Sequence, residues 1–264
     1  MSHSDKKRVL LIGESWVSSA THYKGFDQFG SVTFHTGADP LVNCLKNSPF
    51  EITWMKAHEA VEEFPFDKDG LEQYDAFILS DIGANSLLLP PEVWLHSRTV
   101  PNRLKLLRQR IEDGAGLLMC GGYFSFQGID GKARWRRTPV EDALPVTCLP
   151  WDDRVEIPEG TTAQVILDTH PIVAGLNDPW PYILGINEVE LRERDDVKLI
   201  AKLPDDQGGH PLLAVGHYGK GRSVVWTSDI GPHWLSPAFC EWSGYKTLWT
   251  NVLTWLTQQD EPAG

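Results

Sequence analysis

The sequence has few cysteines and no long apolar run. Its four cysteines, Cys44, Cys120, Cys148 and Cys240, lie far apart and form no CxxC pair, so we expect neither a disulfide framework nor a structural zinc site. The apolar run near the start, RVLLI at 8–12, is too short for a signal peptide, and no segment approaches the roughly 20 apolar residues of a membrane span. The sequence therefore predicts a cytoplasmic protein with reduced thiols and no membrane partner.

Basic residues are also scarce. Lysine and arginine total 24 against 36 aspartates and glutamates, which gives a formal net charge of −12. A surface of this sign repels phosphate backbones and anionic lipids, so we expect no nucleic-acid partner. With 264 residues, 41% of them hydrophobic, the chain is long enough to bury a large core.

The common cofactor motifs are missing. No GxGxxG or GxxxxGK[ST] occurs, so a nucleotide cofactor is not expected, and no HExxH or loop-spaced run of aspartates indicates a metal. Glu14, Asp81, Asp229 and His233 could gather round a cation only if distant strands brought them together. We therefore predict neither a cofactor nor a metal ion.

Strands and helices alternate along the first half of the chain. Residues 8–12 are continuously apolar and end at Gly13, which is typical of a strand buried on both faces. Similar strands are expected at 51–57, 74–81 and 115–120, with helices at 37–47 and 101–113. This order predicts an α/β fold of the flavodoxin-like type, with an open, mostly parallel sheet and helices on both faces.

The second half predicts an antiparallel extension of that sheet. Strands are expected at 197–203, 211–218 and 222–229, and a tight turn at 218–221 joins the last two into a hairpin. A short helix is expected at 139–144. Apolar residues from Tyr245 to Leu256 recur at helical spacing and predict a long closing helix. Without an internal repeat or a linker, residues 1–264 are expected to form a single domain.

Polar residues and glycines follow four of the expected strands. These strand ends are residues 13–16, 80–83, 120–123 and 228–231, and the last continues to His233 and Trp234. The carboxyl ends of parallel strands open onto a shared crevice. We therefore predict a site for a small-molecule ligand there, with substrate-binding residues Ser15, Trp16, Asp81, Gly121, Gly122, Tyr123 and Trp234.

Cys120 is the candidate nucleophile of this crevice. At a sharp turn from a strand into a following helix, its sulfur would project into the crevice, and the helix N-terminus would favour the thiolate. Of the histidines, His233 is the first candidate base, with Asp229 or Glu14 assisting. The alternative is that Cys120 simply packs in the core, because free cysteine is among the most buried residue types.

Tryptophan is abundant, with 11 copies. Flat aromatic side chains in loops can stack on sugars or on another subunit. We expect a homo-oligomer that buries several of the tryptophans assigned to loops, namely Trp16, Trp94, Trp135, Trp151, Trp180 and Trp234.

One stretch resembles a known family. GLLM at 116–119, GGYFSF at 121–126 and GIDGKAR at 128–134, with His170-Pro171-Ile172 and GKGR at 219–222, are similar to bacterial proteins of the class I glutamine amidotransferase-like group, close to the trehalose-utilisation type. The resemblance implies the flavodoxin-like fold. Class I glutaminases carry G-x-C-x-G and a later H-x-E. Here Leu118 replaces the first glycine, and no histidine is followed two residues later by glutamate.

Three functions remain open from the sequence. The first is an amidotransferase-like hydrolase that acts on an amide or related small substrate through Cys120. The second is a catalytically inactive module that binds a small molecule or carbohydrate. The third is a structural subunit of the same fold that forms an oligomer. The incomplete triad means that the resemblance implies ancestry and fold more firmly than chemistry.

Overall fold

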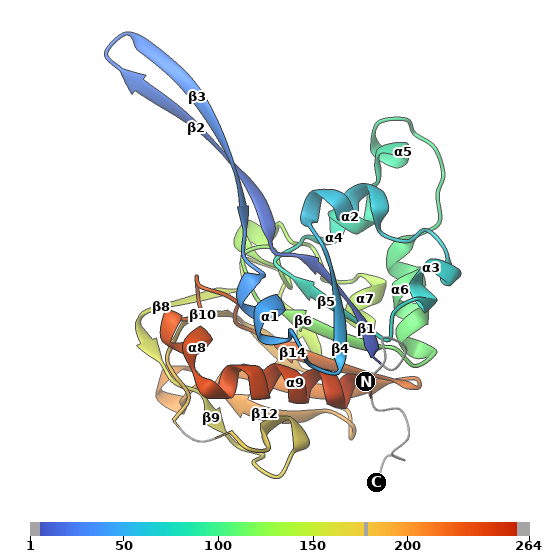
Figure 1. The fold of residues 1–264 in the computed structure, drawn as a ribbon, viewed down its shortest axis with the longest axis vertical. Coiled ribbons are helices and arrows are strands. Elements are labelled where there is room, and N and C mark those ends of the chain that lie inside the picture. The colour runs from blue at the N-terminus through green and yellow to red at the C-terminus, as the bar shows by residue number, and fades with distance from the viewer. Residues whose placement is uncertain (1–5, 177–178, 258–264) are drawn as a thin grey trace.

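An eight-stranded sheet forms the centre of the molecule (Figure 1). The structure, a computed structural model, describes residues 6–176 and 179–257. Five neighbouring strands are parallel and the last three continue the sheet in antiparallel fashion. The order is β4 (Phe50–Met55), β1 (Lys7–Gly13), β5 (Ala76–Ser80), β6 (Gly116–Cys120), β14 (Gly221–Trp226), β13 (Pro211–Tyr218), β12 (Lys198–Lys202) and β9 (Gln164–Val165). The predicted α/β fold with a mostly parallel sheet is confirmed.

Both faces of the parallel strands are buried. In β1, Val9 and Leu11 belong to one apolar core and Leu10 and Ile12 to a second. Successive side chains of a strand point to opposite faces, so a strand between two helical layers must be apolar at every position. This is why the run at 8–12 shows no alternation of apolar and polar residues.

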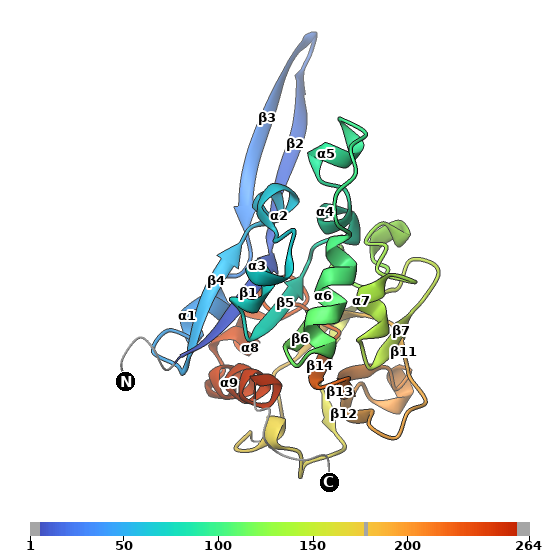
Figure 2. The same ribbon diagram turned by 90° about the vertical axis from the view of Figure 1, so that its right-hand side faces the viewer.

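Helices cover the two faces separately, as Figure 2 shows. Apolar side chains on one side come from α1 (Asp39–Cys44), α8 (Pro237–Glu241) and α9 (Ser243–Thr257). On the other side they come from α2 (Ala57–Glu63), α3 (Lys68–Glu72), α4 (Ala84–Leu88), α6 (Arg103–Glu112) and α7 (Pro139–Asp142). The helices predicted at 37–47, 101–113, 139–144 and the C-terminal end are thus present with shifted ends.

The second half contains the predicted hairpin and two further strand pairs. Strands β13 and β14 pair from Leu213–Trp226 to the closing pair Tyr218–Gly221, as the turn at 218–221 predicts. The additional pairs are β7 (Val146–Cys148) with β11 (Val189–Leu191), and β8 (Arg154–Thr161) with β10 (Ile183–Asn187). In the described ranges, none of the helices has the length and apolar character needed to cross a membrane.

A long hairpin was not predicted. Strands β2 (Ser15–Lys24) and β3 (Asp27–Thr36) pair with each other over ten residue pairs and project from the body in Figure 1. The expectation that 13–16 form a loop is therefore wrong for Ser15 and Trp16, which begin β2. Apart from Ser15, the residues of both strands are exposed or only partly buried on both faces, so the usual alternation of buried apolar and exposed polar residues is missing. We call residues 15–36 the arm.

Candidate functional site

The four predicted strand ends lie at one edge of the sheet. Strands β1, β5, β6 and β14 are consecutive and parallel, and Ser80 at the end of β5 is paired with both Gly13 and Cys120. Cys120 is in turn paired with Trp226 at the end of β14. The loops that carry Glu14, Asp81 and Asp229 therefore leave the sheet side by side, as the sequence predicts.

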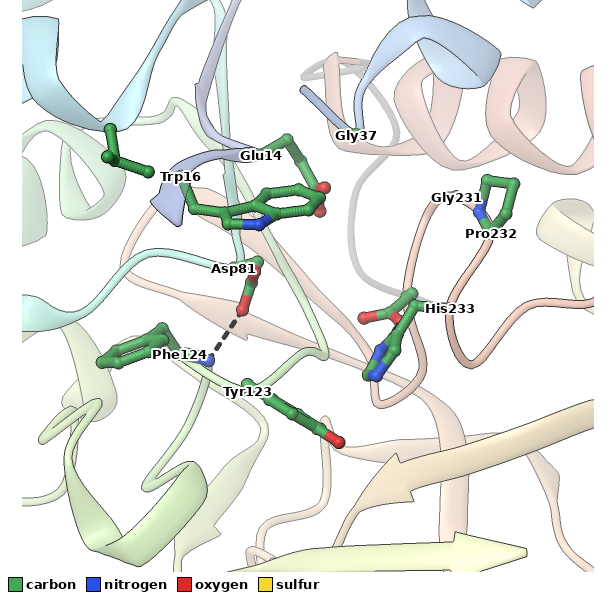
Figure 3. Close-up of a pocket in the computed structure, with 11 residues that line it drawn as sticks. Glu14, Trp16, Gly37, Asp81, Tyr123, Phe124, Gly231, Pro232 and His233 are labelled. Carbon is green, nitrogen blue, oxygen red and sulfur yellow. Dashed lines mark hydrogen bonds and ion pairs between the residues drawn. The ribbon is translucent and has the colours of Figure 1, made fainter. Parts of the chain in front are cut away.

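A cavity of about 520 Å³ opens at this edge. Figure 3 shows Glu14, Trp16 and Asp81 on one side of it and Pro232 and His233 on another. Of the predicted site residues, Glu14, Trp16, Asp81, Tyr123, Asp229 and His233 line it. The other lining residues are Val17, Gly37, Phe124, Gly231 and Pro232.

Glu14 is the most deeply buried acid of the cavity, with 6% of its surface exposed. The Ser80 hydroxyl donates a hydrogen bond to Glu14 Oε1 at 2.5 Å, and the Glu14 backbone N–H donates to the Ser80 carbonyl. Burial raises the pKa of the Glu14 carboxyl well above its usual value, and the charges of Asp81 and Asp229 raise it further. Glu14 is therefore a candidate proton donor at neutral pH.

Asp81 carries the second carboxyl group. The backbone N–H of Phe124 donates to Asp81 Oδ1 at 2.7 Å, and the backbone N–H of Asp81 donates to Ser125 Oγ at 3.1 Å. Burial raises the pKa of Asp81 to about 6, although the hydrogen bond from Phe124 lowers it. Both Glu14 and Asp81 adopt positive φ, 51° and 44°, a conformation that non-glycine residues seldom adopt and that recurs at functional sites.

Gly122 makes room for the Asp81 carboxyl. Its φ is +136°, and a Cβ placed there would lie 2.8 Å from Asp81 Oδ1. The Gly122 backbone is held by Asn187, whose amide oxygen accepts its N–H at 2.9 Å. Gly122 thus lies behind the Asp81 carboxyl and does not line the cavity. The expectation that it binds substrate directly is therefore wrong.

Asp229 and His233 form a hydrogen-bonded pair. His233 Nδ1 lies 2.7 Å from Asp229 Oδ2, and the ring packs edge-on against Tyr123 with centroids 4.6 Å apart. The hydrogen bond to Asp229 raises the pKa of His233, partly offset by burial, and the charges of Glu156 and Asp81 act in the same direction as Asp229. Because Asp229 occupies Nδ1, Nε2 is the nitrogen left for a ligand.

Aromatic side chains form the walls of the cavity. Trp16 and Phe124 are 47% and 42% exposed and both line it. Tyr123 lies between the His233 ring and the Arg154 guanidinium, which sits 5.0 Å from the Tyr123 centroid. Flat apolar walls with a few convergent polar groups are typical of small-molecule sites.

Cys120 lies beneath the cavity floor. Its side chain is fully buried with Leu118, Val224 and Trp226 and does not line the cavity. The chain after it forms turns rather than a helix, so the expected helix N-terminus is missing and the expectation that the sulfur projects into the crevice is wrong. Burial and the Glu14 charge raise the pKa of the Cys120 thiol well above its usual value.

Three other predicted binding residues lie behind the cavity. The Ser15 hydroxyl accepts the Ala57 N–H, and the Gly121 N–H donates to the carbonyls of Trp226 and Ser228. Trp234 is 1% exposed; its backbone N–H donates to Asp229 Oδ2 and its indole N–H donates to Glu156. None of the three lines the cavity. Gly121 and Trp234 hold the loop after β14, which carries Asp229 and His233, and Ser15 holds the start of α2.

The expectation for the loop tryptophans is partly wrong. Trp135, Trp180 and Trp234 are buried within the chain itself, so another subunit cannot cover them. Trp16, Trp94 and Trp151 remain exposed at 47%, 63% and 62%. Aromatic residues between turn-forming glycines and prolines do not reveal from sequence alone whether they fold inward.

Five lining residues were not predicted as site residues, although Gly231 lies within the strand end predicted at 228–231. Phe124 follows Tyr123 directly, and Gly231 and Pro232 lie between Asp229 and His233, so proximity in sequence could have found these three. Val17 and Gly37 lie at the two ends of the arm, and only the pairing of β2 with β3 brings them to the same place. Among the residues that the structure describes, no cluster of three or more His, Cys, Asp or Glu could hold a metal ion.

Comparisons with known proteins place the chain among proteins of this fold. Residues 8–258 match the family described as "Putative glutamine amidotransferase". No curated protein matches. The chain is 39% identical to Cytoplasmic Protein STM3548 from Salmonella typhimurium, with a TM-score of 0.88 over 94% of this chain and 98% of that one. Cytoplasmic Protein STM1381 from Salmonella typhimurium LT2 is also 39% identical, with a TM-score of 0.89 over 95% and 100%.

A more distant likeness concerns the fold alone. A "Putative thua-like protein" from Bacteroides uniformis ATCC 8492 is 12% identical, with a TM-score of 0.59 over 97% of this chain and 93% of that one. The resemblance inferred from the 116–134 signature is confirmed by the family match. The expected cytoplasmic location agrees with the names of both Salmonella proteins.

Proposed function

This chain belongs to the family described as "Putative glutamine amidotransferase", and from that premise we propose that its cavity binds a small neutral or cationic amide and hydrolyses it with water activated by His233. Cys120 forms no covalent bond in this proposal. The substrate carries no net negative charge, because the cavity already holds the acidic groups of Glu14, Asp81 and Asp229.

The observation that carries the proposal is the meeting of the Asp229–His233 pair with Glu14 in one cavity. A carboxylate on Nδ1 fixes the tautomer and orientation of an imidazole and strengthens it as a base. Glu14, whose pKa is raised by burial, supplies a proton donor in the same space. An acid and a base are usually assigned to two titratable groups in one site whose environments shift their pKa values so that one holds a proton and the other can accept one.

The proposed reaction uses one water and no cofactor. His233 Nε2 takes a proton from water as the water oxygen attacks the amide carbon. When the tetrahedral intermediate collapses, the C–N bond breaks and the leaving nitrogen takes the Glu14 proton. The His233 proton then returns to Glu14 through solvent, so the products are a carboxylic acid and an amine.

Asp81 and the aromatic walls would bind the substrate. The Asp81 carboxylate, with a pKa of about 6, is mostly ionised at neutral pH and can accept hydrogen bonds from hydroxyl or ammonium groups. Trp16 and Phe124 offer flat faces for a ring or an aliphatic chain. N-acetylated amino sugars combine a neutral amide, hydroxyl groups and a flat apolar face, and so make good probes of this arrangement.

A thiol mechanism has less support. A nucleophilic cysteine needs contact with substrate and a neighbouring base. The Cys120 side chain is fully buried in the core and lies beneath the cavity floor, whereas His233 lines the cavity above. The sulfur therefore acts in our proposal as a packed group under Glu14.

The test distinguishes a hydrolase from a protein that binds the same ligands without hydrolysing them. Thermal stabilisation is measured across neutral amides, N-acetyl amino sugars, free amino sugars and matched carboxylates, and hydrolysis of each binder is followed by mass spectrometry. We expect binding of neutral or cationic members and slow release of an amine. His233→Gln should retain binding and lose at least 100-fold in rate, whereas the exposed His96→Gln and the buried Cys120→Ala should keep the rate.

Two outcomes reject the proposal in different ways. Binding without turnover by the wild-type protein would show that the protein only binds its ligand, and would refute the roles of Glu14 as acid and His233 as base. Loss of turnover in Cys120→Ala, with binding and melting temperature retained, would restore the thiol mechanism.

A further inference from the structure

The arm exposes a large apolar surface outside the cavity. Figures 1 and 2 both show it standing away from the sheet and helices. Tyr23 and Val32 are 74% and 73% exposed, and Phe26 at the tip is fully exposed. In the part of the chain that the structure describes, β2 and β3 pair only with each other. The root of the arm packs on α2, where the Phe34 ring contacts the His58 ring. Because an isolated two-stranded hairpin is at best marginally stable in water, the part of the arm beyond this root needs a further packing partner.

One face of the arm carries four large apolar residues spaced along its length. The register pairs Val17 with Phe34 and Ser19 with Val32, and Tyr23 lies further along the same face. Between these apolar side chains the face carries Ser19, Thr21 and Gly30, which are small, and Gln28 lies opposite Tyr23. We call this surface, Val17, Tyr23, Val32 and Phe34, the arm face. Large side chains separated by small ones form ridges and hollows that can interlock with a copy of the same surface.

The arm is almost uncharged. It contains only Lys24 and Asp27 as charged residues, and these two are paired across the tip. The chain as a whole has a net charge of −12, so two copies repel each other over most of their surface. Depletion of charged residues is a mark of the core of a protein interface. The arm is therefore a surface by which two copies can approach without bringing like charges together.

We propose that the arm face packs against the arm face of a second copy of this chain. The four large residues of the arm face are 47% to 74% exposed, and Phe26 at the tip is fully exposed beside them. Trp16 and Phe29 are also exposed but lie on the opposite face of the arm. Most soluble oligomers are homo-oligomers in which the same patch is used on both subunits, and the arm face satisfies that requirement.

A second segment that projects from the body also carries exposed apolar residues near the proposed interface. Helix α5 (Pro91–Trp94) extends from the same end of the molecule as the arm in both views. Trp94 and Leu95 there are 63% and 56% exposed. The root of the arm also lines the cavity through Trp16 and Val17, so the proposed interface continues to the cavity rim. The proposal does not depend on the chemistry assigned to His233.

The first test measures mass in solution. Sedimentation of the wild-type chain at about 50 µM should give a multiple of the 29.6 kDa chain mass. Tyr23→Glu combined with Val32→Glu places two negative charges on each arm face and should give a single chain of 29.6 kDa. Trp151→Glu combined with Ile166→Glu is the matched control, because both residues are exposed apolar residues outside the arm. The melting temperature of the body should change little in either variant.

The second test locates the contact. Thr21→Cys on the arm face should give a covalent dimer with a short bis-maleimide cross-linker, whereas Lys220→Cys in the exposed β13–β14 turn should not. The wild-type chain, with two half-buried and two buried cysteines, gives the background. A wild-type chain that sediments as a monomer, an arm variant that stays oligomeric, or cross-linking at position 220 but not at 21 would each overturn the proposal.

Discussion

Asp229 Oδ2 accepts hydrogen bonds from two neighbours at once, lying 2.7 Å from His233 Nδ1 and 2.8 Å from the backbone nitrogen of Trp234. The second bond fixes the carboxylate, and the carboxylate fixes the imidazole. The Trp234 indole also stacks on the His233 ring, with centroids 5.4 Å apart and planes 24° from parallel. His233 therefore presents Nε2 in a defined direction before any ligand arrives, which is what preorganised acid–base catalysis requires.

Asp229→Asn should lower the pKa of His233. The carboxylate stabilises the imidazolium, so its replacement by a neutral amide removes the largest cause of the raised pKa. A raised histidine pKa stabilises the fold at pH values below the unfolded value, roughly 6.5, and this stabilisation is lost as the pH rises through the folded value. The variant should therefore lose stability mainly on the acidic side.

The measurement is an NMR titration of the imidazole signals, with His233→Gln used to assign the resonance. An unchanged or higher His233 pKa in Asp229→Asn would contradict the assigned pairing.

Asp81→Asn should stabilise the protein above pH 6. Burial raises the folded pKa of Asp81 from 3.8 to about 6, so its contribution to stability is fully present below 3.8 and is lost as the pH rises through about 6. An amide does not ionise, and its oxygen can still accept the Phe124 N–H. Because Asp81 is partly exposed, we expect a gain of about 1–2 kcal/mol at pH 8.

Urea unfolding at pH 4 and pH 8 measures this difference. The exposed Asp195→Asn is the control and should show no such gain at pH 8. A variant that is less stable than the wild type at pH 8 would show that the Asp81 charge supports the fold.

The sheet and the cavity edge were predictable because they follow from continuous apolar runs and from one rule of parallel sheets. The apolar runs that end at Gly13 and Ser80 indicated both the strands and the edge of the sheet at which their carboxyl ends meet. The direction of Cys120 was not predictable, because in a strand a shift of one residue moves a side chain to the opposite face. The strands within 15–36 were also not predictable, because both faces of the arm are exposed and neither face is distinguished by burial. Gly37 reaches the cavity only through the fold of that arm.

Cys120 should react more slowly than Cys44 and Cys240 in the native protein. Its side chain is fully buried, whereas Cys44 and Cys240 are half-buried, although burial raises the pKa of all three thiols. Labelling with iodoacetamide at pH 8, followed by peptide mass spectrometry, should modify Cys44 and Cys240 first and Cys120 only as the protein unfolds. Cys120→Ala should cost about 1–2 kcal/mol of stability through the lost packing.

The labelling order has a direct bearing on the two mechanisms. Rapid, selective modification of Cys120 in the folded state would require an open route from the cavity to the sulfur and would contradict its complete burial. The Cys148 thiol, also buried, provides the internal control for protection by burial alone.

Gly122→Ala should damage the site and the fold together. At φ +136° an alanine is strained, at a cost of about 1–3 kcal/mol, and its Cβ would lie 2.8 Å from Asp81 Oδ1 and 3.0 Å from Asp81 Cβ. Gly175→Ala is the reference, because Gly175 has φ +76°, close to the left-handed region that alanine can adopt, and its nearest contact would be an ordinary 3.9 Å to Thr247. We expect Gly122→Ala to cost at least about 1 kcal/mol more than Gly175→Ala, because its backbone is more strained and its Cβ also pushes on Asp81.

A double-mutant cycle with Asp81→Ala tests where that extra cost arises. Removing the Asp81 carboxyl relieves the closest contact, so Gly122→Ala should be less destabilising in the Asp81→Ala background, with a coupling of about 0.5–2 kcal/mol. Additive losses would mean that the strain at Gly122 is independent of Asp81. The glycine would then serve the turn after β6 alone, and the close packing of that turn against the acidic group would have no part in holding Asp81 at the cavity wall.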